Sequence, residues 1–126
     1  MRVGNQHYRT VWMEGAVVKL IEQRLLPHRF EILNCPSFGD TARAIHEMAV
    51  RGAGAIGAAA GYAMAQGVLE AADAAFEADV EEAARVIRST RPTAHDLFFA
   101  VDRVREAAMA AAIPARAREA AVKAAA

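Results

Sequence analysis

The chain has 126 residues, and its 15 Lys and Arg balance its 15 Asp and Glu, so the formal net charge is zero. This length suits one domain with a core of its own, and the neutral balance gives no global reason to expect nucleic acid or a membrane as partner. A single cysteine, Cys35, excludes a disulfide within the chain and a cysteine-rich metal site, and it suits a reducing compartment. The first residues carry no apolar run that predicts a signal peptide. We therefore expect a cytoplasmic protein without a metal.

Strand-forming residues occupy the first part of the chain. Residues 7–13 are rich in Thr, Val and aromatic side chains, and 16–22 form a second apolar run after a Glu14-Gly15 turn. Residues 29–34 then alternate polar and apolar side chains. Because the connections are short, antiparallel pairing is favoured. The sequence predicts a small three-stranded antiparallel sheet within residues 1–35.

From residue 40 onward, the spacing of apolar residues becomes helical and predicts about five helices. Asp40 is predicted to cap the first helix, with a buried stripe ending at Met48, and Gly52 to end it. The second and third helices are predicted at residues 55–71 and 76–88. The fourth is predicted to start at a Thr93 cap and the fifth to run from Pro114 to 126. The inward residues of the fourth helix are Leu97, Val101, Val104 and Ala108. The fold class is therefore α+β, with residues 1–126 as one N-terminal domain: a sheet over 1–35 and a helical bundle over 40–126.

Gly52, Gly54 and Gly57 match the G-x-G-x-x-G spacing of dinucleotide-binding loops. That loop works only between a strand and a helix of a βαβ unit, and residues 41–50 are helical by their spacing. We interpret Gly52 and Gly54 as a tight turn between two helices, and Gly57 and Gly61 as positions that permit close packing. Free N–H groups at the start of the second helix offer an anion site, to which Arg51 adds a guanidinium suited to phosphate.

A second loop, Ser89 to Thr93, joins the third and fourth predicted helices. Pro92 disfavours helical geometry at Arg91, which places this arginine on a defined loop. Taken alone, a loop arginine is more often a solvated surface residue. Two arginines that each stand beside a helix start, Arg51 and Arg91, together favour a single anion-binding site.

These two loops resemble a known family. Residues 50–57, VRGAGAIG, resemble the VRGAPAIG signature of methylthioribose-1-phosphate isomerases, and residues 89–94, STRPTA, resemble a second segment of the same family. Residues 7–12, HYRTVW, look more like its bacterial methionine-salvage branch. The family is related to the α, β and δ subunits of initiation factor 2B and to archaeal ribose-1,5-bisphosphate isomerases. The resemblance spans residues 8 to 110 and covers most of the chain.

The resemblance implies an aldose–ketose isomerase that converts 5-methylthioribose 1-phosphate to 5-methylthioribulose 1-phosphate in methionine salvage, without a cofactor. It implies that Arg51, Gly52, Ala53 and Arg91 bind the sugar phosphate. The family's catalytic cysteine and aspartate belong to a Rossmann-like C-terminal domain, through which the full-length enzymes dimerise. That domain lies outside these 126 residues, so we expect no catalytic residue and no turnover in this chain alone. Cys35 is interpreted as a buried thiol.

Four positions depart from the family pattern: Gly54 replaces the usual proline, His95 a more usual apolar residue, Asp96 an asparagine, and Phe99 a common tryptophan. Asp96 would add negative charge near Arg91. The preferred sugar phosphate therefore stays open, with ribose 1,5-bisphosphate and 5-deoxyribose 1-phosphate as rival substrates. Two rival hypotheses for the whole chain are a non-enzymatic regulatory module, like the initiation-factor subunits, and a helical domain without a ligand.

Overall fold

The computed structural model describes residues 2–3, 6–7, 10–22, 31–50, 52–111 and 113–125. Strands β3 (Val11–Glu14), β4 (Val17–Ile21) and β5 (Ile32–Cys35) form an antiparallel sheet in the order β3-β4-β5, which confirms the predicted sheet. Val18 pairs with both Met13 and Cys35 and fixes the register. Two further strands, β1 (Arg2–Val3) and β2 (Gln6–His7), form a separate antiparallel ladder that was not predicted.

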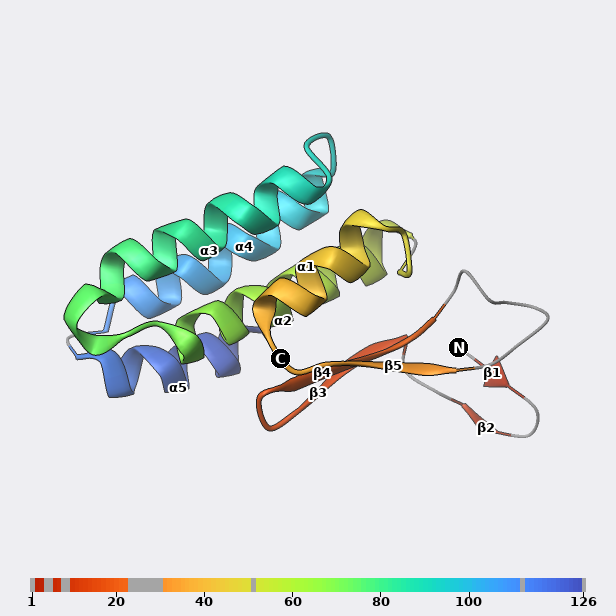
Figure 1. The fold of residues 1–126 in the computed structure, drawn as a ribbon, viewed down its shortest axis with the longest axis horizontal. Coiled ribbons are helices and arrows are strands. Elements are labelled where there is room, and N and C mark those ends of the chain that lie inside the picture. The colour runs from red at the N-terminus through yellow and green to blue at the C-terminus, as the bar shows by residue number, and fades with distance from the viewer. Residues whose placement is uncertain are drawn as a thin grey trace.

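Five α-helices follow the sheet, and the α+β fold class is confirmed. They are α1 (Phe38–His46), α2 (Ala53–Glu70), α3 (Phe76–Thr90), α4 (His95–Met109) and α5 (Pro114–Ala125), with a short 3₁₀ turn η2 (Asp73–Ala75) before α3. Helix α2 packs against the other four helices and against β3 and β4. In Figure 1, the sheet lies below α1 and α2, and α3 and α4 lie above them.

Small residues allow α2 to be the buried central helix that its sequence predicts. Every residue from Ala59 to Val68 is buried, because alanines and glycines let neighbouring helices come close. The inward residues predicted for α4 are also buried: Leu97, Val101, Val104 and Ala108. Pro114 opens α5 as predicted, since its missing N–H needs no acceptor in a first helical turn.

The start and end of α1 differ from the prediction. Ser37, not Asp40, is the N-cap, and its hydroxyl accepts the N–H of Asp40 at 3.2 Å. The N–H of Phe38 donates to a carboxylate oxygen of Glu70 at 2.7 Å, which satisfies a second amide. The helix ends at His46, so Met48 lies beyond it, with a φ of 64° and 46% of its surface exposed. The buried stripe therefore stops short of Met48.

Two other cap predictions are wrong. Gly52 does not end α1 but is the N-cap of α2. Thr93 does not cap α4, whose N-cap is Ala94 without a side-chain hydrogen bond. The N–H of Ala94 instead donates to the carbonyl oxygen of Arg91 at 3.0 Å. This bond closes a turn that keeps Thr93 outside the helix.

A buried glutamine joins the sheet to the helices. Gln66 of α2 is only 1% exposed, and its Nε2 donates to the carbonyl oxygens of Ala16 (2.9 Å) and Cys35 (2.7 Å). Its Oε1 accepts the hydroxyl of Thr41 in α1 at 2.5 Å. One side chain thereby satisfies polar groups from the β3–β4 turn, the end of β5 and α1.

Two glycines of α2 predict opposite effects of an added methyl group. Gly54 is exposed, and a Cβ there would meet nothing within 4 Å, so Gly54→Ala should stabilise the fold by about 0.5–1 kcal/mol. At Gly67, a Cβ would lie 2.5 Å from the Cβ of Ala83, so Gly67→Ala should force α2 and α3 apart and cost about 1–3 kcal/mol. Urea unfolding measures both free energies. Changes of the same sign would contradict this packing.

Candidate anion-binding site

The connection from α1 to α2 and the connection from α3 to α4 lie at the same end of the helical bundle (Figure 1). His46 Nδ1 at the end of α1 lies 3.3 Å from the carbonyl oxygen of Thr90 at the end of α3. One turn into α2, a Cβ on Gly57 would lie 3.3 Å from the backbone oxygen of Asp96 in α4. The starts of α2 and α4 are therefore neighbours.

Helix α2 begins with its backbone donors uncovered by any side-chain cap. Its N-cap, Gly52, is exposed and has a φ of 89°, which favours glycine. The first intrahelical bond is donated by Ile56 N–H to the carbonyl of Gly52 at 2.9 Å, so the amides of residues 53–55 precede it and have no intrahelical acceptor. No acidic residue lies in the first turn. This end of an 18-residue helix can therefore receive an anion.

Helix α4 starts in a similar way. Its N-cap, Ala94, offers no side-chain acceptor, and the first intrahelical bond is donated by Phe98 N–H to Ala94 at 3.3 Å. Asp96 stands in the first turn, where a carboxylate is stabilised by the helix dipole. Asp96 also partly neutralises the positive end of α4. The positive end of α2, which has no acidic residue in its first turn, is therefore the more favourable of the two for an anion.

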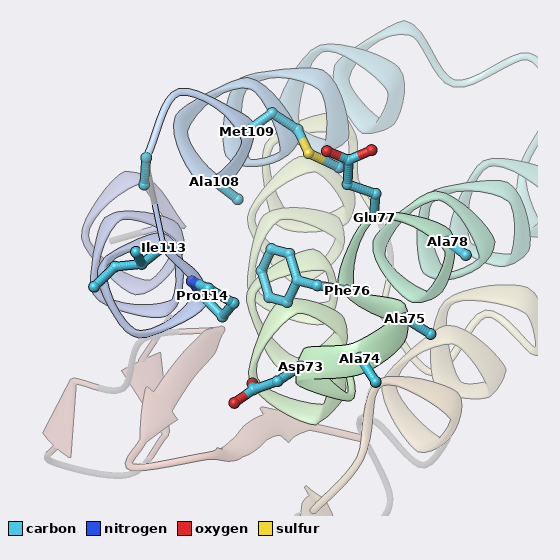
Figure 2. A pocket seen from close by; sticks show the side chains of 11 residues that line it. Asp73, Ala74, Ala75, Phe76, Glu77, Ala78, Ala108, Met109, Ile113 and Pro114 are labelled. Carbon is cyan, nitrogen blue, oxygen red and sulfur yellow. The ribbon is translucent and has the colours of Figure 1, made fainter.

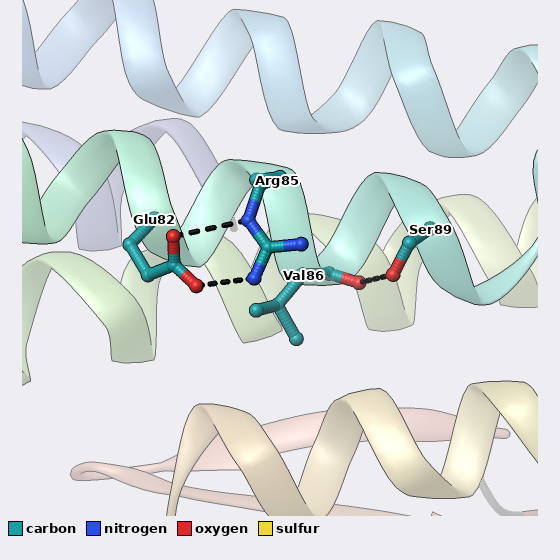
Figure 3. Close-up of polar contacts among 4 residues, drawn as sticks. All are labelled: Glu82, Arg85, Val86 and Ser89. Carbon is teal, nitrogen blue, oxygen red and sulfur yellow. Dashed lines mark hydrogen bonds and ion pairs between the residues drawn. The ribbon is translucent and has the colours of Figure 1, made fainter.

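Arg91 is placed by the last turn of α3. Ser89 Oγ donates to the carbonyl oxygen of Val86 at 2.7 Å, and Thr90 Oγ1 donates to that of Ile87 at 2.6 Å. Figure 3 shows the Ser89 bond next to the ion pair of Arg85 with Glu82, which joins two side chains on the exposed face of the same helix. The chain then leaves the helix at Arg91, with φ −142° and ψ 79°, as Pro92 predicts.

The Arg91 guanidinium is incompletely satisfied. Its Nη1 is buried and has no hydrogen-bond partner among the described residues. A buried donor without an acceptor costs free energy, and a donor with a positive charge costs more than a neutral one. A bound anion would supply the acceptor and the countercharge.

The structure brings three of the four predicted binding residues to one end of the bundle. Gly52 and Ala53 form the start of α2, and Arg91 stands at the end of α3. Arg51 lies outside the described residues, between Val50 and Gly52. The convergence of Arg51 and Arg91 on one ligand therefore stays a prediction.

A hollow of about 340 Å³ lies beside these helix starts, and we call it the α2–α4 hollow. Its residues are Gly54, Gly57, Ala58, Gly61 and Tyr62 of α2, Asp96, Phe99, Ala100 and Arg103 of α4, and Ala125 of α5. Sequence reasoning missed it. The spacing of Gly54, Gly57 and Gly61 along one helix face was the available signal, but the sequence indicated only a turn at Gly54 and close packing at the other two.

A second cavity, of about 560 Å³, lies at the opposite end of the bundle, between the start of α3 and the α4–α5 connection (Figure 2). The ring of Phe76 points into it, with Ile113 and Pro114 across from it. Asp73 on its rim already accepts a hydrogen bond from Arg118 at 2.6 Å, and Arg118 stacks 5.5 Å from the centre of the Phe76 ring. This cavity is remote from Arg91 and contains none of the predicted site residues.

Cys35 is buried, as expected, with 1% of its surface exposed. Burial raises the pKa of its thiol to about 11, and the nearby carboxylates of Asp40 and Glu22 act in the same direction, against a hydrogen bond with Thr41. The thiol is therefore protonated near neutral pH and is a poor nucleophile. Within the described part of the chain, no cluster of three or more His, Cys, Asp or Glu could hold a metal ion.

The fold bears on two possible properties of the chain, dinucleotide binding and membrane insertion. Gly52 follows α1 and a turn, not a strand, which confirms that the glycine spacing is not a dinucleotide-binding loop. Of the helices in the described ranges, none is long and apolar enough to cross a membrane.

Comparison with known proteins yields relatives named methylthioribose-1-phosphate isomerase, although no family model matches the chain. The chain is 45% identical over 118 residues to the methylthioribose-1-phosphate isomerase of Methylocella silvestris, covering 92% of the chain and 31% of that protein. It is 40% identical over 127 residues to the same enzyme of Paramagnetospirillum magneticum, covering 99% and 34%. The chain thus spans about a third of the length of these curated relatives.

Two solved structures have the same fold over nearly the whole chain. One is the 5-methylthioribose 1-phosphate isomerase from Pyrococcus horikoshii, with a TM-score of 0.87 and 34% identity over 93% of this chain and 34% of that one. The other is the δ subunit of translation initiation factor eIF-2B from A. fulgidus, with a TM-score of 0.87 and 34% identity over 94% and 36%.

Proposed function

Because this chain belongs to the methylthioribose-1-phosphate isomerase family and spans about a third of the length of the relatives that it matches, we propose that it is the substrate-holding part of such an enzyme. The complete enzyme would convert 5-methylthioribose 1-phosphate to 5-methylthioribulose 1-phosphate in cytoplasmic methionine salvage. One observation carries the proposal: the buried Nη1 of Arg91 lacks an acceptor within the described residues, at the bundle end where α2 and α4 start without side-chain caps.

The reaction divides naturally between two parts of an enzyme. In an aldose 1-phosphate the anomeric carbon is blocked by the phosphate, so the ring must be opened before hydrogen moves between C2 and C1. That chemistry needs an acid–base pair, a dry pocket and a phosphate held in a fixed position. Arg51, the amides of Gly52 and Ala53, and Arg91 would hold the phosphate.

The catalytic groups would come from elsewhere. A Rossmann-like C-terminal domain would supply a cysteine and an aspartate, and it would form the dimer. No cofactor or metal enters this scheme. The chain of residues 1–126 should therefore bind a sugar phosphate and show no isomerase turnover; turnover by the purified chain would overturn this division of roles.

Ligand-dependent stabilisation tests the proposal on the chain itself. We expect 5-methylthioribose 1-phosphate to raise the melting temperature, because a ligand at 100 times its Kd adds about 2.7 kcal/mol to stability. Unphosphorylated 5-methylthioribose should give no shift. Arg91→Met should abolish the shift, whereas Arg116→Met, on the exposed face of α5, should retain it. A shift that is equal in both variants, or absent with every phosphorylated sugar tested, would contradict the site.

A regulatory role has one observation in its favour: the initiation-factor δ subunit matches as well as the isomerase does, with the same TM-score of 0.87. Both predicted arginines are present in the sequence, which favours the enzyme. A full-length chimera, in which this chain replaces the matching segment of the Methylocella silvestris relative, discriminates between them. Assayed with 5-methylthioribose 1-phosphate, ribose 1,5-bisphosphate and 5-deoxyribose 1-phosphate, it also identifies the preferred substrate.

A further inference from the structure

The α2–α4 hollow has the features of a docking surface, and we propose that it seats the polypeptide that makes up the other two thirds of the full-length enzymes. The inference rests on the proposed function and adds where, and by which contacts, the covering part attaches. The partner surface would present an apolar side chain to Phe99, flanked by a basic group facing Asp96 and an acidic group facing Arg103.

Phe99 is the most exposed large apolar residue in the described part of the chain, with 68% of its surface accessible. It stands over a wall of small residues on α2, where Gly54 and Ala58 are also exposed. An aromatic ring beside a shallow hollow of this kind is typical of the buried centre of a protein interface. A partner side chain could fill the hollow without displacing any bulky group.

The charges on α4 distinguish this face from its neighbours. Arg105 pairs with Glu81 of α3, and Asp102 pairs with Arg88, also of α3. Among the described residues, neither Asp96 nor Arg103 has an ion-pair partner, although both line the hollow. Asp96 lies three residues before Phe99 and Arg103 four residues after it, so an acidic and a basic side chain flank an apolar one along the helix. That order calls for a partner with the reverse order of charges.

The position of the hollow fits a covering domain. Gly54 and Asp96 belong to the first turns of α2 and α4, so the hollow adjoins the proposed phosphate site. A sugar phosphate held there by this chain alone would face water, because Gly52, Gly54 and Asp96 are all exposed. Isomerisation needs water excluded, so the part that closes the site must rest on the surface beside it.

Thiol labelling at single positions tests the proposal. Ala58→Cys places a thiol in the exposed wall of the hollow, and Ala78→Cys places a matched one on the exposed face of α3 at the far end of the bundle. The buried Cys35 contributes little background in the isolated chain, and mass spectrometry of the labelled peptides separates each thiol from the cysteines of the rest of the chimera. In the isolated chain, both thiols should react with iodoacetamide at similar rates. In the full-length chimera, the rate at Ala58→Cys should fall at least tenfold while that at Ala78→Cys stays within twofold.

The outcomes separate docking from ligand binding. Equal labelling of Ala58→Cys in the chain and in the chimera would overturn the docking surface, even if sugar phosphates still stabilise the chain. Protection without any phosphate-dependent shift would support docking and contradict the phosphate site.

The Methylocella silvestris relative, with a cysteine at the position aligned with Ala58, repeats the measurement in a natural full-length protein. Fast labelling there also overturns the proposal, and slow labelling supports it. In the chimera, Arg103→Glu should restore at least part of the labelling at Ala58→Cys, because it reverses the charge that we assign to the contact.

Discussion

Replacing Gln66 with leucine should lower the free energy of unfolding by about 3 kcal/mol or more, the largest effect that we expect from a single substitution in the core. The carbonyl oxygens of Ala16 and Cys35 would lose the Gln66 amide as donor. The hydroxyl of Thr41 would lose the Gln66 oxygen and keep only the carbonyl oxygen of Ser37 as acceptor. A buried polar group left without a hydrogen bond costs about 1–3 kcal/mol, and leucine can replace none of the three bonds. Equilibrium unfolding in urea gives the change.

Met64 provides the matched control for this substitution. It is also fully buried in α2, and Met64→Leu keeps the volume without touching a hydrogen bond, so it should cost less than about 1.5 kcal/mol. If Gln66→Leu proves no more destabilising than Met64→Leu, the junction between sheet and helices does not depend on this amide.

Replacing Arg91 with alanine in the full-length chimera should lower kcat/KM by about two orders of magnitude, which corresponds to about 2.7 kcal/mol of lost transition-state stabilisation. The guanidinium ends in a buried Nη1 without a partner among the described residues, and a phosphate would provide the acceptor. The same loss is expected for Arg51→Ala, because the sequence places that arginine directly before the start of α2.

Steady-state kinetics with 5-methylthioribose 1-phosphate measure both losses. Arg116→Ala, which removes an exposed arginine from α5, should leave kcat/KM within about twofold and controls for net charge. Unchanged kinetics in Arg91→Ala would assign this residue a structural role. A loss confined to Arg51→Ala would place the phosphate entirely on the α2 side of the site.

The same local pattern occurs at two helix starts but marks the N-cap at only one of them. Ser37-x-x-Asp40 and Thr93-x-x-Asp96 both have the spacing of a helix-start signal. Ser37 does cap α1, and the prediction missed it by choosing Asp40. Thr93 does not cap α4, because Arg91 accepts the N–H of Ala94 and holds Thr93 in the preceding turn. Local spacing cannot reveal which turn a loop will form.

The loops of the candidate site were predictable, and the surroundings were not. Gly52 is itself a glycine and Arg91 precedes a proline, so the backbone preferences at both positions can be inferred from sequence alone. The hollow beside them depends on how α2 packs against α4, and the role of Gln66 depends on a carbonyl 50 residues earlier. Contacts over such distances in sequence leave no local periodicity to interpret.

The bonds of Gln66 also bear on the order in which the chain can assemble. A ribosome releases β3, β4 and β5 before it releases α2, so the strands emerge without the amide that later holds Ala16 and Cys35. Short strands need several neighbours with an apolar face, or packing against a helix, to be stable, and here α2 packs against β3 and β4. We therefore expect the sheet of β3, β4 and β5 to gain its final structure only after the central helix has been synthesised.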